Sequence, residues 1–188
     1  MEVMKIIERA EKQTSLGRFD KKSAISYIND ALYKIVSRNS LKLKESRYVF
    51  LHEKITLNGI VIKVNSVEFE DDRLNSMFGF RVNPDGTIST MKKVKGKLEP
   101  LDYNDPIVEE KFNIVYIGYI PVKEEDDKIN MPDQYESSIV NYLKHKIFEE
   151  QDEFDKSQFF EQQFRKELID VAHSKQSVIV KPSKYSLL

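Results

Sequence analysis

The spacing of hydrophobic positions changes twice along the chain, from a helical period to a strand period and back. In the first forty residues, apolar side chains recur every three or four positions, which is the spacing of one face of an α-helix. This pattern predicts a short helix over residues 1–13 and a longer helix over residues 20–40. Asp20 or Ser23 can cap the start of the second helix by accepting a hydrogen bond from a free backbone N–H group.

The middle of the chain is rich in β-branched and aromatic residues, which indicates strands. Residues 48–57 and 60–69 flank Asn58 and Gly59, a dipeptide that supplies the positive φ angles of a tight turn, so we expect a β-hairpin there. A second turn signal, Asn-Pro-Asp-Gly, lies between two further short strands. The other expected elements are strands at residues 78–82, 87–90 and 112–120 and polar loops at residues 71–75 and 92–106.

From Pro132 onward the helical period returns and predicts two helices, the second over residues 155–172. Proline suits the first position of a helix, where its missing N–H group costs nothing. Because only residues 151–154 separate the two helices, we expect them to pack antiparallel. The predicted fold class is therefore α+β: a helical body, made of the N-terminal helix and the C-terminal antiparallel helix pair, with an inserted small antiparallel β-sheet and an extended C-terminal tail.

The expected domain organisation follows from this order of elements. Residues 1–172 are predicted to form a single domain, in which the helical parts 1–40 and 131–172 surround a β-rich insertion at residues 48–121. Residues 173–188 are predicted to form the extended tail. The length of 188 residues is enough for one domain with a real hydrophobic core.

Composition narrows the class of protein. Hydrophobic residues make up 40% and charged residues 32%, a globular mixture with a net charge of −1, which argues against a surface that binds nucleic acid throughout. The chain has no cysteine, which excludes disulfides and zinc–thiolate sites. The charged N-terminal residues are unlike a signal peptide, and no apolar run has the roughly 20 residues of a membrane span. We therefore expect an aqueous, intracellular protein with no membrane partner.

Candidate catalytic and metal-binding chemistry is sparse. His145 and Glu149 lie one helical turn apart, but no third zinc ligand has a diagnostic spacing. The acidic run at residues 149–155 lacks the alternating ligands and central glycine of a calcium loop, so we interpret it as a solvated connection between helices. No nucleophile motif or glycine-rich phosphate loop is present. We predict no catalytic residue, no metal and no cofactor, and hence a protein that is not an enzyme.

Two further clusters allow a functional and a structural interpretation. A lysine-rich segment could contact phosphates, or it could be a solvated hairpin, since it has no interleaved aromatic residue for base stacking. Its lysines are Lys92, Lys93, Lys95 and Lys97. Phe159, Phe160 and Phe164 could form a binding groove, although their helical spacing is more typical of a core.

The C-terminal tail is the segment most suggestive of partner binding. From residue 171 onward it contains three lysines and no acidic residue, together with large apolar side chains that disordered tails usually lack. It could add as a strand to the sheet edge of another chain, or it could fold back onto its own domain. The candidate docking residues are Val178, Ile179, Val180, Lys181, Pro182, Lys184, Tyr185, Leu187 and Leu188.

The layout of these elements resembles the head–tail connector, or adaptor, proteins of tailed bacteriophages. The features that carry the resemblance are the helix at residues 20–40, a strand that ends at Tyr119-Ile120-Pro121, an acidic loop, the Met-Pro-Asp-Gln-Tyr helix entry at residues 131–135, the aromatic-rich helix pair and the basic tail. The middle of the chain, residues 48–111, is more elaborate than in the simplest adaptors.

The resemblance implies a structural virion protein at the head–tail interface, made in the host cytoplasm. Such proteins form rings, commonly of about twelve subunits, that dock beneath the portal protein, extend the DNA channel and present their far side to tail proteins or further rings. The tail would then insert into the portal or between neighbouring subunits, and duplex DNA would make only transient, non-specific contact in the channel.

Two other functions remain open from the sequence. The chain could be a small nucleic-acid-binding or regulatory module that uses the lysine segment at residues 92–97 and the basic tail. It could also be an enzyme whose site has no recognisable motif.

Overall fold

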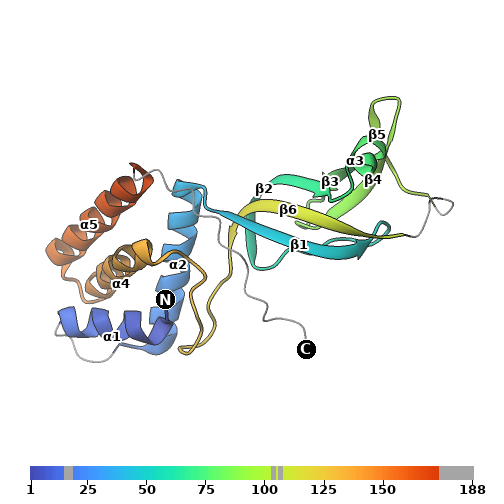
Figure 1. Ribbon diagram of the computed structural model, residues 1–188. Helices are drawn as coiled ribbons and strands as arrows, with labels where there is room; N and C mark the ends of the chain where they lie inside the picture. Colours follow the sequence, from blue (N-terminus) through green and yellow to red (C-terminus); the bar gives the residue numbers. More distant parts are fainter. Residues whose placement is uncertain (15–18, 103–104, 106–107, 174–188) are drawn as a thin grey trace.

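The computed structural model describes residues 1–14, 19–102, 105 and 108–173, to which all structural statements refer (Figure 1). The tail residues named above lie outside this range. In chain order the elements are α1 (Val3–Thr14), α2 (Lys21–Asn39), β1 (Lys42–Phe50), β2 (Ile60–Phe69), α3 (Asp72–Met77), β3 (Phe78–Val82), β4 (Ile88–Val94), β5 (Lys97–Pro100), β6 (Glu109–Tyr119), a 3₁₀ turn (Asp133–Tyr135), α4 (Glu136–Glu150) and α5 (Phe154–His173).

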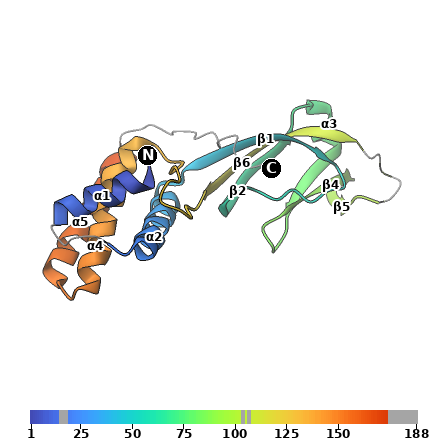
Figure 2. The same cartoon turned by 90° about the horizontal axis from the view of Figure 1, so that it is seen from below.

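The molecule is elongated and has two parts, a helical body and a β unit. Figures 1 and 2 show α1, α2, α4 and α5 grouped at one end and the strands at the other, with β1 and β6 running between them. Each part has its own hydrophobic core, and the two cores share no residue. The α+β class, with a β-rich insertion between helical segments, is confirmed.

The helical body forms where the amphipathic pattern predicted it. The Asp20 carboxylate accepts a hydrogen bond from the Ser23 backbone N–H at 2.8 Å and caps α2, as expected. One stripe of α2 is buried against α4, and α4 packs against α5. The start of α4 differs from expectation because Pro132 precedes a 3₁₀ turn, so that regular α-helix begins only at Glu136.

The expected hairpin between residues 48–57 and 60–69 is wrong. The first strand, β1, begins six residues earlier and ends at Phe50, and β1 and β2 do not pair with each other. Both pair antiparallel with β6, which gives a sheet of order β1-β6-β2. Residues 51–59 instead run back along the sheet, because β1 ends beside Glu109 and β2 starts beside Tyr119, at opposite ends of β6. Leu51, Ile55 and Leu57 of this connecting segment are buried in the core of the β unit.

A buried polar contact holds the segment that connects β1 and β2 to the sheet. The Glu45 carboxylate, on β1, accepts hydrogen bonds from the Tyr116 hydroxyl at 2.5 Å and from the Asn58 backbone N–H at 3.0 Å. Burial and the neighbouring Glu45 carboxylate raise the pKa of Tyr116 far above its usual range, so the phenol stays protonated and can donate.

The second sheet has the order β3-β4-β5. The predicted turn at residues 83–86 is confirmed, with Gly86 at a φ of 80°. The loop expected at residues 92–106 is wrong over its first part, where β4 and β5 form a hairpin around Lys95 and Gly96. Both turn residues have positive φ angles, 48° and 78°, as a tight two-residue hairpin requires. The loop expected at residues 71–75 contains the short helix α3, which Asp71 caps.

Aromatic rings join the two sheets into one unit. The ring of Phe112, on β6, lies 4.6 Å from that of Phe69 and 5.5 Å from that of Phe80, measured between centroids. These pairs are tilted or edge-on, the arrangements that aromatic quadrupoles favour. The second sheet therefore covers one face of the first.

Candidate interaction surfaces

The lysine segment is only partly free to contact a partner. The Lys92 ammonium pairs with Asp102 at 2.6 Å and with Asp105 at 3.3 Å, and these contacts raise its pKa. Lys93 donates to the Asn75 carbonyl at 2.6 Å. Lys95 and Lys97 lie exposed at the β4–β5 hairpin tip. The four lysines thus share a hairpin, but two of them already have partners within the chain.

The first sheet has one face that the second sheet does not cover, which we call the open sheet face. Residues directly opposite each other on antiparallel strands place their side chains on the same side, so the strand register assigns this face. A hydrogen bond of 2.9 Å between the side chains of Ser46 and Asn113 lies on it. Its members are Lys42, Lys44, Ser46, Tyr48 and Phe50 of β1, Glu109, Lys111, Asn113, Val115 and Ile117 of β6, and Lys63, Ser66 and Glu68 of β2.

The half of the open sheet face nearer the helical body is basic and partly apolar. Ile117 lies between Lys42 and Lys63, and Val115 lies beside Lys44. Val115 and Ile117 are half-buried, and the three lysines are exposed, with no ion-pair partner in the part of the chain that the structure describes.

The far half of the open sheet face carries two exposed aromatic side chains. Tyr48 is 64% and Phe50 is 41% exposed, and neither belongs to either core. The charges here are mixed, since Glu68 and Glu109 share this half, and Lys111 pairs with Glu70 at 2.9 Å. Neighbouring exposed aromatic side chains are typical of surfaces that bind another molecule.

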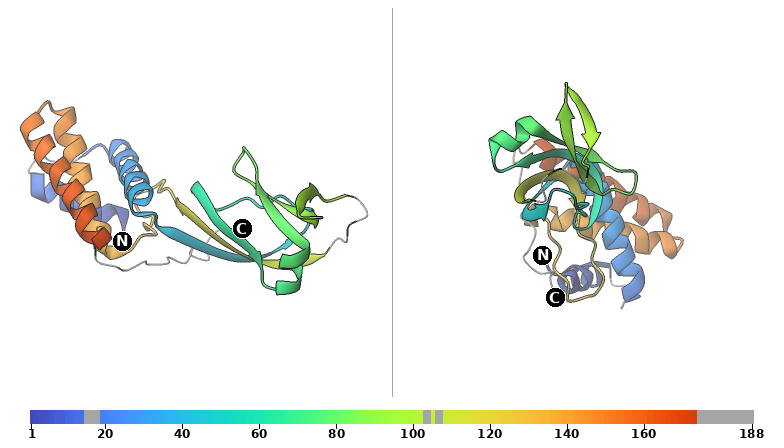
Figure 3. Two further views of the ribbon diagram at one scale, coloured as in Figure 1. Left: turned by 90° about the horizontal axis from the view of Figure 1, so that it is seen from above. Right: turned by 90° about the vertical axis from the view of Figure 1, so that its right-hand side faces the viewer.

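A second exposed surface, which we call the acidic corner, consists of residues 149–155 between α4 and α5. Five of its seven residues are acidic, and Phe154 is 60% exposed among them. Asp152 adopts a left-handed φ of 58°, a conformation that aspartate tolerates, and the chain reverses there. In Figures 1 and 2 and in the left view of Figure 3 the corner lies at the end of the molecule farthest from the sheets.

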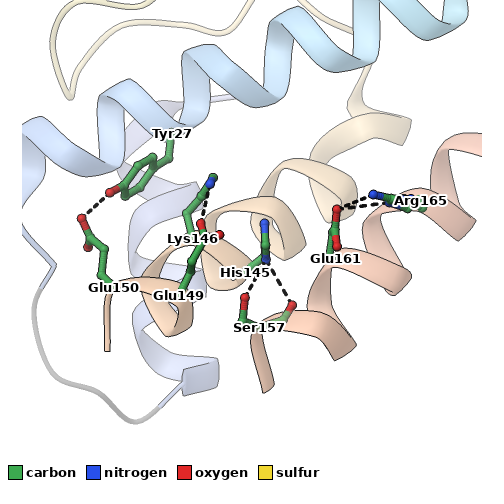
Figure 4. Close-up of polar contacts among 8 residues, drawn as sticks. All are labelled: Tyr27, His145, Lys146, Glu149, Glu150, Ser157, Glu161 and Arg165. Atoms are coloured by element: carbon green, nitrogen blue, oxygen red, sulfur yellow. Dashed lines mark hydrogen bonds and ion pairs between the residues drawn. The ribbon is translucent and has the colours of Figure 1, made fainter. Parts of the chain in front are cut away.

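Some of the corner's carboxylates are engaged within the chain and others are not. Figure 4 shows Glu149 paired with Lys146, and Glu150 accepting a hydrogen bond from the Tyr27 hydroxyl. Burial and the Glu150 carboxylate raise the pKa of Tyr27 to about 12. Asp152 and Asp155 have no ion-pair partner among the described residues.

His145 lies in the helical interface, where it joins α4 to α5. It is buried, and its Nδ1 lies 2.9 Å from the Ser157 hydroxyl and 3.2 Å from the Ser157 carbonyl (Figure 4). Burial lowers the pKa of His145, and Lys146 adds to this effect, while the Ser157 carbonyl, Glu149 and Glu161 oppose it. No group of three or more potential metal ligands occurs in the described residues. His145 therefore serves as a packing and hydrogen-bonding residue.

The lowered pKa of His145 predicts a specific loss of stability on acidification. The folded state prefers neutral imidazole. The contribution of His145 to the free energy of unfolding is therefore complete above the unfolded-state pKa of about 6.5, and it declines as pH falls below that value. We expect the urea midpoint of unfolding to decrease when the pH is lowered from about 7.5 to about 5.5, and to decrease less in His145→Gln. His52→Gln, at an exposed position, is the matched control. Equal pH sensitivity of wild type and His145→Gln would contradict this assignment.

The phenylalanine cluster of α5 is partly a hydrophobic core and partly an exposed surface, which were the two interpretations given by the sequence. Phe164 is buried against Tyr142, with ring centroids 5.0 Å apart, and Phe160 stacks on Phe148. Phe159, in contrast, is 53% exposed on the outer side of α5, close to the acidic corner. Helical spacing correctly predicts a core at Phe164 but not the exposure of Phe159.

The open sheet face is the surface that the sequence interpretation missed. Lys42 and Lys44 flank the apolar Leu43 in β1, and this was a partial signal because alternate residues of a strand face opposite sides. The alternation does not continue, since the buried Glu45 is charged and the exposed Tyr48 and Phe50 are aromatic. Placing the start of the strand at residue 48 concealed this partial signal.

No protein-family model matches the sequence, and a search of curated proteins finds no significant match. Across the described residues, none of the helices combines the length and apolar character needed to cross a membrane.

Proposed function

We propose that the protein is a subunit of a head–tail connector ring of a tailed bacteriophage. The observation that carries the proposal is the two-part architecture, in which a four-helix body and a separate β unit occupy opposite ends of an elongated subunit. Such a subunit can contact neighbours on both sides, which a ring built from one repeated heterologous interface requires.

The arrangement of the C-terminal third also supports a connector. β6 leaves the β unit at Tyr119, and the backbone of residues 125–129 then pairs with the start of α1 before the chain enters α4. The Asn29 side chain bonds both the N–H and the carbonyl of Val122, at 2.9 Å each, and so fixes this passage to α2. The strand, acidic loop and helix pair that carry the resemblance therefore form one continuous path along the helical body.

Electron microscopy and native mass spectrometry of the purified full-length protein test the proposal. We expect closed rings of about twelve subunits that join the portal protein of the phage whose genome encodes this chain. A chain ending at Ala172 should remain folded, because all the core residues within the described part of the chain precede that position, yet it should no longer join the portal. A full-length protein that stays monomeric with and without the portal would overturn the proposal.

A nucleic-acid-binding module is the second candidate function, and the hairpin-tip residues Lys95 and Lys97 are the observation in its favour. It has less support, since Lys92 and Lys93 are already engaged within the chain. Tight binding of duplex DNA at physiological salt would favour it over the connector.

A further inference from the structure

We propose that the open sheet face of one subunit binds the acidic corner of a second copy of this chain, and that this contact is the repeated interface of the assembly. The inference rests on the proposed function, because it names the surfaces through which the ring would close. It involves no residue of the C-terminal tail.

The charges of the two surfaces are complementary. Lys42, Lys44 and Lys63 have no ion-pair partner within the described chain, and neither do Asp152 and Asp155. Lys42 and Lys63 lie on the outer strands, about two strand spacings or roughly 10 Å apart. Opposite charges across an interface orient the partners and disfavour incorrect ones.

The apolar groups of the two surfaces also match. Val115 and Ile117 lie between the lysines and are half-buried. Ile117 packs against the core of the helical body, so the apolar surface open beside the lysines is formed mainly by Val115. On the corner, Phe154 is exposed between Asp152 and Asp155, and Phe159 is exposed on the next turn of α5. An aromatic side chain packed beside an apolar residue and surrounded by charge pairs is typical of an interface centre with a polar rim.

A single chain cannot form this contact with itself. The open sheet face belongs to the β unit, whereas the acidic corner lies at the opposite end of the helical body (Figure 3). Only a second copy can bring the two surfaces together. The interface is head-to-tail, so each subunit uses one surface for each neighbour, and such an interface closes into a ring when its rotation permits.

Charge reversal on each surface tests the proposal in the full-length protein. The first variant is Lys42→Glu/Lys44→Glu and the second is Asp152→Lys/Asp155→Lys. Each reverses charges at exposed positions and places like charges against each other in the interface, which should weaken self-association at least about 100-fold. Sedimentation velocity measures assembly, and circular dichroism checks that both variants are folded.

Mixing the two variants supplies the decisive result. The reversed corner of the second variant can bind the reversed face of the first, and the unchanged corner of the first can bind the unchanged face of the second. We therefore expect the mixture to assemble while each variant alone does not. Lys95→Glu/Lys97→Glu, an equal charge change at the hairpin tip, should assemble normally.

Three outcomes would overturn the interface. Wild-type rings that neither variant disturbs would place the interface elsewhere and leave the connector proposal standing. Folded variants that fail to assemble even when mixed would show that the two surfaces do not face each other. A monomeric wild type that binds a labelled single-stranded oligonucleotide, and loses it in Lys42→Glu/Lys44→Glu, would assign the open sheet face to nucleic acid instead.

Discussion

Replacing Gly59 by alanine is expected to destabilise the β unit by roughly 3–5 kcal/mol. Gly59 has a φ of 78°, and a Cβ there would lie 2.3 Å from the Tyr119 carbonyl oxygen. The left-handed backbone alone costs about 1–2 kcal/mol for a residue with a side chain. The remainder comes from separating β2 from β6, because a backbone carbonyl held in a sheet cannot rotate away as a side chain can. Urea denaturation followed by circular dichroism measures the loss.

Gly86→Ala separates the two contributions. Gly86 has nearly the same φ, 80°, but a Cβ there would meet no atom within 4 Å. This substitution should therefore cost only the backbone term of about 1–2 kcal/mol. Gly118→Ala tests the same close approach of β2 and β6 from the other strand, since its Cβ would lie 2.5 Å from the Ile60 carbonyl oxygen. Equal losses at Gly59 and Gly86 would show that the close approach to Tyr119 contributes nothing.

Gly59 also illustrates what a sequence can predict about a sheet. Asn58-Gly59 correctly indicates a positive φ, but the local pattern does not identify the strand partner. The partner of β2 is β6, whose first residue lies about fifty positions later in the chain. Strand pairing across such a distance depends on which apolar faces share a core, and a local window contains no information about that. The missed turn at Lys95-Gly96 has a different cause, because lysine at the first position is not a typical hairpin signal.

The helices were predicted more accurately because their signal is local. The stripe of Ile28, Leu32 and Ile35 defines a buried face of α2 within a few turns of sequence, and the Asp20 cap is encoded three residues from its partner. Even so, helical spacing could not distinguish the buried Phe164 from the exposed Phe159, since both lie on α5 near other phenylalanines.

The candidate surfaces were the least predictable feature. The sequence indicated the acidic run at residues 149–155, but its interpretation as a simple solvated connection took no account of the exposure of Phe154. The open sheet face requires three strands from distant parts of the chain, so its basic and apolar rows become visible only when the register is known. Charge complementarity between the ends of the molecule is a property of the fold and not of any segment.

Phe112→Ala and Phe164→Ala are expected to destabilise different halves of the molecule, each by roughly 3–5 kcal/mol. Phe112 is fully buried at the centre of the aromatic cluster that joins the two sheets, whereas Phe164 is buried against Tyr142 in the helical body. Removing either ring leaves a cavity that the surrounding groups fill only partly. Because the two cores share no residue, each cavity should weaken only its own part.

Hydrogen exchange resolved by residue tests this independence. Phe112→Ala should accelerate exchange in β1, β2 and β6 and leave α4 and α5 protected, while Phe164→Ala should have the opposite effect. Phe159→Ala, at an exposed position, should change stability by no more than about 0.5 kcal/mol. Faster exchange throughout the molecule in both core variants would show that the parts unfold as one unit. The coupling would then run through two connections. Only Ser40 and Leu41 separate α2 from β1, and Tyr119 at the end of β6 is buried in the core of the helical body.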